Sequence, residues 1–120
     1  MTNRLHLYKG KIWLAGLLLG AGFCGAAAAV EPPADPARRA ELVHLLRQDC
    51  GSCHGLTLKG GLGPALTRAA LAGKAPEVLR ATIYYGRPGT PMPPWRGFLT
   101  EDEAGWLVDL LMQGTLEAEQ

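Results

Sequence analysis

Two cysteines and a histidine stand together in the run Cys50-Gly51-Ser52-Cys53-His54, directly after a stretch with helical spacing of apolar residues. Two thiols separated by two residues and followed by an imidazole form the pattern for covalent attachment of a c-type haem. Each thiol can add to one haem vinyl group, and the turn between them brings His54 under the iron as proximal ligand. The sequence therefore predicts one haem c per chain, covalently attached through Cys50 and Cys53, around which a short chain must fold.

Two other interpretations of this pattern are a thioredoxin-like redox pair and half of a zinc site. A thioredoxin-like pair is expected after a strand in a βαβ unit, whereas an amphipathic helix precedes this one. A zinc site with four ligands lacks its second half, because the one remaining cysteine, Cys24, lies in a segment that we expect to be removed. A disulfide between Cys50 and Cys53 would close a very short loop and stabilise the fold little. Haem attachment is therefore the preferred interpretation.

The N-terminal segment has the pattern of a secretory signal peptide. A basic start is followed by 19 uncharged residues, 12–30, which begin strongly apolar and end in a run of alanines. This pattern predicts cleavage near Ala28 or Ala29, so that residues 1–29 are the signal peptide and the mature protein is periplasmic. The alternative is an uncleaved anchor helix, since 19 uncharged residues can span a bilayer, and only then would the protein be attached to the membrane.

The charge balance gives no reason to expect a nucleic-acid partner. The whole chain has 12 basic and 11 acidic residues, and loss of the signal peptide would remove three basic residues and no acidic one. The remaining nine basic residues form no cluster that could neutralise a run of phosphates. We therefore expect no binding to nucleic acid.

Prolines, glycines and capping residues divide the rest of the chain into helices and loops. Residues 30–36 have the composition of an extended linker, and Asp35 can cap a helix that carries Pro36 in its first turn. Apolar residues at spacings of three and four predict this helix up to about Cys50, with Gly51 as its left-handed stop.

Further helical signals follow in the second half of the chain. A short turn is expected over 67–72, a helix from Pro76 to Gly86, and a last helix from Thr100, which opens a capping box, to Gly114. The segments 51–64 and 86–98 have no helical or strand period, and the second of them holds four prolines. Because no strand signal is present, the sequence predicts an all-α fold of about three to four helices around the haem.

The sixth iron ligand is expected from the proline-rich loop, where Met92 stands in Pro91-Met92-Pro93-Pro94. The prolines restrict the backbone, and a loop offers no helix face from which a methionine could pack into the core. A thioether ligand suits haem iron and raises its reduction potential relative to two imidazoles, which favours an electron carrier. The predicted metal ligands are therefore His54 and Met92.

Four other residues are considered for the site. Met112 lies at the end of the last helix, where a methionine is ordinarily a core side chain. His44 lies about 200° around the first helix from its apolar residues, so we expect it to be solvated. Trp95 and Arg96 directly follow the run Pro91-Met92-Pro93-Pro94 and are candidates to hydrogen-bond a haem propionate, with an exposed surface position as the alternative for Arg96.

Taken together, these features resemble class I monohaem cytochromes c. The resemblance rests on the first helix, the Cys50–His54 run, Gly63-Pro64-Ala65-Leu66, Gly89-Thr90-Pro91-Met92-Pro93 and a last helix introduced by Leu99-Thr100. It implies a class I cytochrome c fold over residues 37–116.

The resemblance also implies two structural details. The carbonyl of Pro64 accepts a hydrogen bond from Nδ1 of the proximal histidine, which fixes the tautomer of the ring. The first and last helices cross beside the haem, usually with an aromatic residue in each, for which this chain offers Leu45, Leu46 and Trp106.

Within this family, the runs 50–64 and 85–95 look most like the small periplasmic cytochrome encoded with the haem-cd-type nitrite reductase of denitrifying bacteria. The resemblance implies a carrier of single electrons between respiratory redox partners, with nitrite reductase as a candidate, and no enzymatic activity. Two alternatives are an electron-donating partner in maturation of the reductase haem, and a haem enzyme or sensor with a labile sixth ligand. We expect a monomer that docks through apolar loop residues near the haem: Leu62, Pro64, Pro91, Pro93 and Pro94.

Overall fold

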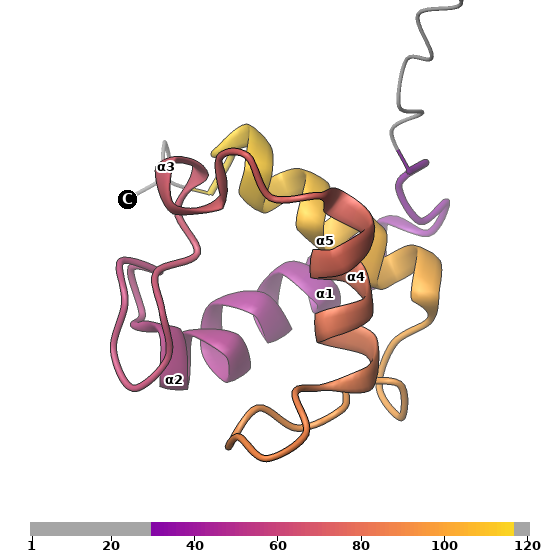
Figure 1. Cartoon of the computed structure of the whole chain (residues 1–120). Helices are drawn as coiled ribbons and strands as arrows, with labels where there is room; N and C mark the ends of the chain where they lie inside the picture. The colour runs from indigo at the N-terminus through magenta and orange to yellow at the C-terminus, as the bar shows by residue number, and fades with distance from the viewer. Residues whose placement is uncertain (1–29, 117–120) are drawn as a thin grey trace, which may run out of the picture.

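The computed structural model describes residues 30–116, which form helices joined by loops, and these residues contain no β-strand. The predicted signal peptide lies outside the described residues. Figure 1 shows the order of the elements along the chain. They are α1 (Pro36–Leu45), a π-helical turn η1 (Leu46–Cys50), α2 (Gly51–His54), α3 (Arg68–Leu71), α4 (Pro76–Tyr85) and α5 (Glu101–Gln113). The all-α prediction is confirmed over this range.

The helices begin at the capping residues that the sequence indicates. The Asp35 side chain accepts a hydrogen bond from the Ala37 amide at 2.9 Å, and Pro36 occupies the first helical position, where no amide donor is needed. At α5 the capping box is complete, because the Glu103 amide donates to Thr100 Oγ1 at 3.2 Å and the Thr100 amide donates to Glu103 Oε2 at 2.7 Å. These bonds satisfy amides that have no partner within the helix.

The prediction that the first helix stops at Gly51 is wrong. After α1 the chain makes the wider turn η1, and α2 then continues the helical path to His54. Gly51 has right-handed angles, φ −60° and ψ −29°, and the positive φ of 86° that ends the helix belongs to Gly55. Gly51 is buried, and a β-carbon on it would lie 3.4 Å from the Cα of Leu56. The returning chain therefore passes at van der Waals distance from this position.

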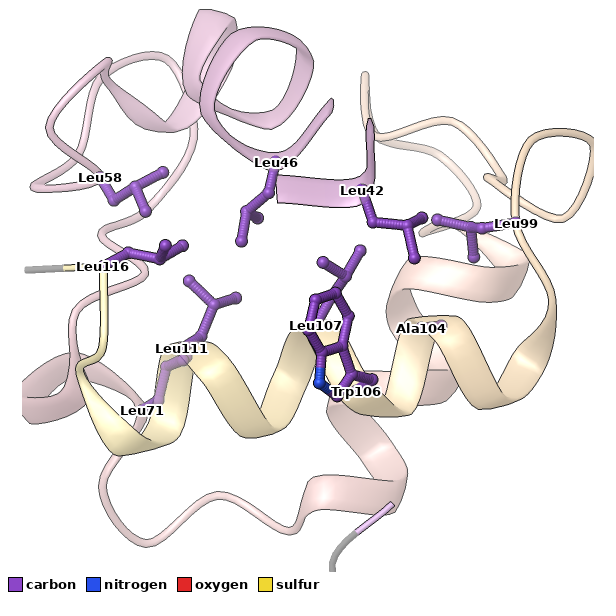
Figure 2. Packing of buried hydrophobic residues seen from close by; sticks show 10 residues of the cluster. All are labelled: Leu42, Leu46, Leu58, Leu71, Leu99, Ala104, Trp106, Leu107, Leu111 and Leu116. Atoms are coloured by element: carbon purple, nitrogen blue, oxygen red, sulfur yellow. The ribbon is translucent and has the colours of Figure 1, made fainter. Parts of the chain in front are cut away.

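The core forms where α1 and η1 pack against α5. Leu42 and Leu46 point from the first helical stretch toward Leu107 and Leu111 of α5 (Figure 2). Each fully buried leucine contributes about 1.5–3 kcal/mol through loss of apolar surface. Leucines therefore fill this contact, while Leu45 is only partly buried and Trp106, at 9% exposed, joins the cluster from α5.

A charged link on the surface holds the same two helices together. The guanidinium of Arg38 in α1 donates through Nε to Glu103 Oε1 at 2.7 Å and through Nη2 to Glu103 Oε2 at 3.0 Å. Arg38 also donates to the backbone oxygen of Phe98 at 2.8 Å and pairs with Glu41. One arginine thus joins α1, the turn before α5, and α5 itself.

Among residues 30–116, no helix has both the length and the apolar character needed to cross a membrane.

Candidate functional site

The paired thiols lie on one helical path. Because η1 and α2 continue α1, Cys50 and Cys53 are one helical turn apart, with Cys50 partly buried and Cys53 exposed. No disulfide joins them. Burial, with a smaller contribution from the negative charge of Asp49, raises the pKa of the Cys50 thiol to about 11. Both thiols line the same cavity, which also reaches His54.

The loop after α2 folds back and holds the end of this helix. The amide of Gly60 donates to the His54 oxygen at 2.8 Å, and the amide of Gly63 donates to the Cys53 oxygen at 2.8 Å. These two carbonyls would otherwise lack partners at the helix end. The loop thereby fixes the position of His54 relative to the two thiols.

The imidazole of His54 is oriented by Pro64. Its Nδ1 lies 2.6 Å from the carbonyl oxygen of Pro64. A carbonyl only accepts, so Nδ1 carries the proton and donates, which leaves Nε2 with a lone pair for a metal. The contact expected from the resemblance is therefore present. Gly63 permits it, since a β-carbon there would stand 2.8 Å from both Nδ1 and Cε1 of the ring.

The loop that follows α4, which we call the methionine loop (residues 86–94), contributes Met92 to the lining of the same cavity. Its two ends meet where the Arg87 amide donates to the Met92 oxygen at 3.2 Å. Inside the loop, Thr90 Oγ1 donates to the Arg87 oxygen at 2.7 Å and accepts from the Met92 amide at 3.4 Å. Beyond it, the Trp95 amide donates to the Ile83 oxygen at 3.2 Å, so the loop is anchored on α4.

These two loops, together with η1, α2, α3, α4 and α5, line a cavity of about 710 Å³. The volume is within the range of pockets for small molecules and cofactors, about 300–1,000 Å³. In Figure 1, α2 and the loop after it lie at the left, whereas α4 lies at the right and the methionine loop at the bottom. Residues from all of these segments line the cavity. The apolar side chains that line the cavity include Leu46, Leu66, Leu79, Ile83, Val108 and Leu111.

The residues at this cavity fit a haem c. Apolar walls suit a macrocycle, and the donors are two thiols, one imidazole with an available Nε2 and one thioether. Residues 30–116 contain no group of three or more His, Cys, Asp or Glu side chains that could hold a metal ion.

The structure places three of the four other candidates outside the cavity lining. Met112 packs against the core, His44 is exposed, and neither lines the cavity. Trp95 lines it, whereas Arg96 does not.

Sequence reasoning did not single out the charged residues that line the cavity. These are Asp49, Lys74 and Arg87, from η1, the segment between α3 and α4, and the methionine loop. Asp49 and Arg87 stand close in sequence to Cys50 and Met92, and this proximity was the one available signal.

Comparison with known proteins places the chain in a family. Residues 37–111 match the family described as cytochrome C oxidase, cbb3-type, subunit III. The chain is 57% identical to cytochrome c55X of Pseudomonas aeruginosa over 88% of this chain and 87% of the relative. It is 55% identical to cytochrome c55X of Paracoccus denitrificans over 77% of this chain and 89% of that protein.

Two further proteins are similar over different shares of their length. A solved structure of the c-type cytochrome NirC superposes with a TM-score of 0.67 at 65% identity, covering 68% of this chain and 96% of that chain. Dihydro-heme d1 dehydrogenase of Pseudomonas aeruginosa is 37% identical over 83% of this chain, but this match spans only 19% of the dehydrogenase.

These comparisons confirm the resemblance predicted from the sequence, to cytochromes c and within them to the small cytochrome encoded with the nitrite reductase. They also confirm the electron-carrier class of function that accompanies it. A c-type cytochrome implies haem c as cofactor, which agrees with the donor set at the cavity. The chain belongs to the c-type cytochromes.

Proposed function

We propose that this protein is a periplasmic electron carrier with one haem c, attached through Cys50 and Cys53 and held by His54 and Met92. The observation that carries the proposal is that all four side chains line one largely apolar cavity although they come from two separate segments. When bound, the haem supplies an iron that changes its oxidation state by one electron.

Two ligands from the chain leave no coordination position for a substrate, so the proposal is a carrier and not an enzyme. Both ligand residues are held by neighbouring groups. The Pro64 carbonyl accepts from His54, the Arg87 amide donates to the Met92 oxygen, and the Thr90 hydroxyl accepts from the Met92 amide. Such support keeps the ligands in place in both oxidation states, and little reorganisation is then needed when an electron moves. A haem enzyme or sensor would need a sixth ligand that leaves readily.

For the partners, we propose redox proteins of denitrification, with nitrite reductase as an acceptor. The similarity to the c-type cytochrome NirC supports this choice, since it covers nearly all of that chain. The docking surface is the apolar rim, which we define as five exposed residues that line the cavity: Leu62, Pro64, Val78, Pro91 and Pro93. Pro94, which we expected from the sequence to belong to this surface, does not line the cavity, and the exposed Val78 of α4 does.

A second candidate function is electron exchange during maturation of a haem. The supporting observation is the 37% identity to a part of dihydro-heme d1 dehydrogenase, which indicates that this enzyme contains a segment built like the present chain. A separate cytochrome of the same kind could exchange electrons with that segment. The two functions are distinguished by rapid mixing of the oxidised or reduced protein with nitrite reductase and, separately, with the dehydrogenase. The faster electron transfer identifies the partner.

The proposed ligand set is tested by a spectrum recorded during redox titration of the purified protein. We expect one redox centre whose oxidised form shows the near-infrared methionine–iron band. Met92→Ala should remove this band, lower the reduction potential and admit cyanide, because the thioether is lost. Met112→Ala is the matched control and should keep the band. A band that survives Met92→Ala and disappears in Met112→Ala would assign the ligand to the last helix.

A further inference from the structure

The first described residue of the chain is held on α5. The backbone nitrogen of Val30 donates to Asp109 Oδ2 at 2.9 Å in a partly buried contact between residues 79 positions apart. Farther along, Arg39 NH1 donates to the Pro33 oxygen at 2.8 Å. The segment before α1 is therefore fixed to the folded domain at two points. Figure 1 shows this segment near the beginning of α5.

The side chain of Val30 has its own place on the same helix. A β-carbon on Gly105, one turn before Asp109, would lie 2.9 Å from Val30 Cγ2 and 3.4 Å from Arg80 Cδ. A glycine inside a helix costs about 1 kcal/mol relative to alanine. Its presence in the buried middle of α5 is explained by the close approach of Val30, which packs partly buried against the core.

The rule for signal-peptide cleavage leaves the cleaved bond undecided. Small residues at the first and third positions before the bond fit cleavage after Ala28 as well as after Ala29. Only the second choice turns the Val30 nitrogen into the new α-amino group. This nitrogen already lies at hydrogen-bond distance from a carboxylate, and a positive charge on it makes the bond charge-assisted.

We propose that processing breaks the Ala29–Val30 bond and that the resulting α-ammonium group of Val30 forms an ion pair with Asp109. The inference rests on the export proposed above. In the hydrolysis, the oxygen of one water molecule enters the new Ala29 carboxylate, and the Val30 nitrogen takes up the protons that make it an ammonium group. The mature N-terminus is then fastened to the helix whose Val108 and Leu111 line the cavity.

Other charged groups are close enough to be considered. Arg80 on α4 also approaches Gly105, and its Nε lies 3.7 Å from Glu101 Oε1. Arg80 is thus paired at the beginning of α5, while Asp109 stands two turns farther along. The ion pair with Val30 is therefore a separate interaction, and the two can be tested independently.

The first test is the intact mass of the holoprotein purified from the periplasm after expression with its own leader. We expect the mass of a chain that begins at Val30 and carries one haem. Cleavage at any other bond overturns this inference and leaves export intact. A mass that begins at Met1, in protein recovered with the membrane, overturns the cleavage and assigns the leader to an anchor. Haem-free protein that stays in the cytoplasm overturns the export proposal as well.

The second test compares Asp109→Asn with Asp102→Asn, an exposed carboxylate on the same helix. Below pH 7, Asp109→Asn should reduce the folding equilibrium constant about tenfold. This loss should disappear as the pH rises above about 8, where an α-amino group becomes neutral, whereas the effect of Asp102→Asn should stay constant. A loss from Asp109→Asn that is the same at pH 6 and pH 10 would overturn the ion pair.

Discussion

Gly63 packs directly against the imidazole of His54, where a β-carbon would come within 2.8 Å of two ring atoms. Gly63→Ala should therefore displace the ring or the loop, at a cost of about 1–3 kcal/mol in the free energy of unfolding. Because the hydrogen bond from Nδ1 to Pro64 weakens, the imidazole becomes a poorer donor to iron, and the reduction potential should rise.

Gly97→Ala is the control for this change, since a β-carbon on Gly97 would meet nothing within 4 Å. Redox titration and chemical unfolding of the two variants provide the measurement. If Gly63→Ala matched the parent protein in both, the glycine would have no part in positioning the histidine.

The link between Arg38 and Glu103 predicts a dependence of stability on pH. Hydrogen bonds from Arg38, with a smaller contribution from the Thr100 amide, lower the pKa of Glu103 from 4.5 to about 2. A lowered pKa means that the stabilisation is fully present above pH 4.5 and is lost as the pH falls through about 2.

Glu103→Gln should accordingly reduce the free energy of unfolding by about 1–2 kcal/mol at pH 7, with the difference from the parent shrinking toward pH 2. Glu101→Gln, at a more exposed carboxylate of the same helix turn, should change the stability less. Urea unfolding at several pH values measures both. A difference that grew toward pH 2 would contradict the assignment.

Thr90 is expected to limit how readily Met92 leaves the iron. Its hydroxyl bonds to the backbone on both sides of the loop, at Arg87 and at Met92. Thr90→Val should keep the methionine–iron band but speed cyanide binding about tenfold, the effect of losing hydrogen-bond support of about 1.4 kcal/mol. Thr57→Val, at an exposed position outside the cavity lining, is the control. Equal cyanide rates in the two variants would argue against this role.

Partner docking should depend on the apolar rim more than on charge. Leu62 is 81% exposed and lines the cavity, whereas Leu56 is 69% exposed and does not. Leu62→Glu should therefore slow electron transfer to nitrite reductase about tenfold, and Leu56→Glu should have little effect. Stopped-flow rates should also change only weakly with ionic strength. A steep fall with added salt would show that charge pairing governs docking.

Covalent attachment predicts that acid–acetone extraction leaves one haem on the polypeptide. In the Cys50→Ala/Cys53→Ala double variant the haem should be extractable. The variant should also lose most of its helical circular dichroism, because the core has no other filling for a cavity of about 710 Å³. A cooperative thermal transition like that of the parent protein would show that the polypeptide folds without the bond.

Much of the architecture could be predicted because its signals are local. The beginnings of α1 at Pro36 and of α5 at Glu101 depend on the capping residue immediately before each. The haem-attachment pattern is likewise contained within the run Cys50–His54. The path through Cys50 could not be predicted in this way. Glycine is the residue type that commonly ends helices, but Gly51 has right-handed angles and lies within the helical path.

The cavity lining was harder to predict, because it depends on contacts between distant segments. Lys74 and Val78 both line the cavity. In the sequence, however, Lys74 cannot be distinguished from any surface lysine, and Val78 has the pattern of an ordinary apolar helix residue. Gly105 is similar, since only its approach to Val30 explains a glycine within a helix. Such residues are recognised only when the packing of the helices is known.

The separation of 65 positions between Arg38 and Glu103 also bears on how the chain folds. Both cysteines, His54 and Met92 lie inside this loop, so α1 and α5 can meet only by closing it, and closing a flexible loop becomes costlier in entropy as its length grows. A haem bonded at Cys50 and Cys53 and held by Met92 would divide the loop into shorter ones before the ends meet. The cofactor would then speed the search for the native topology as well as filling its centre.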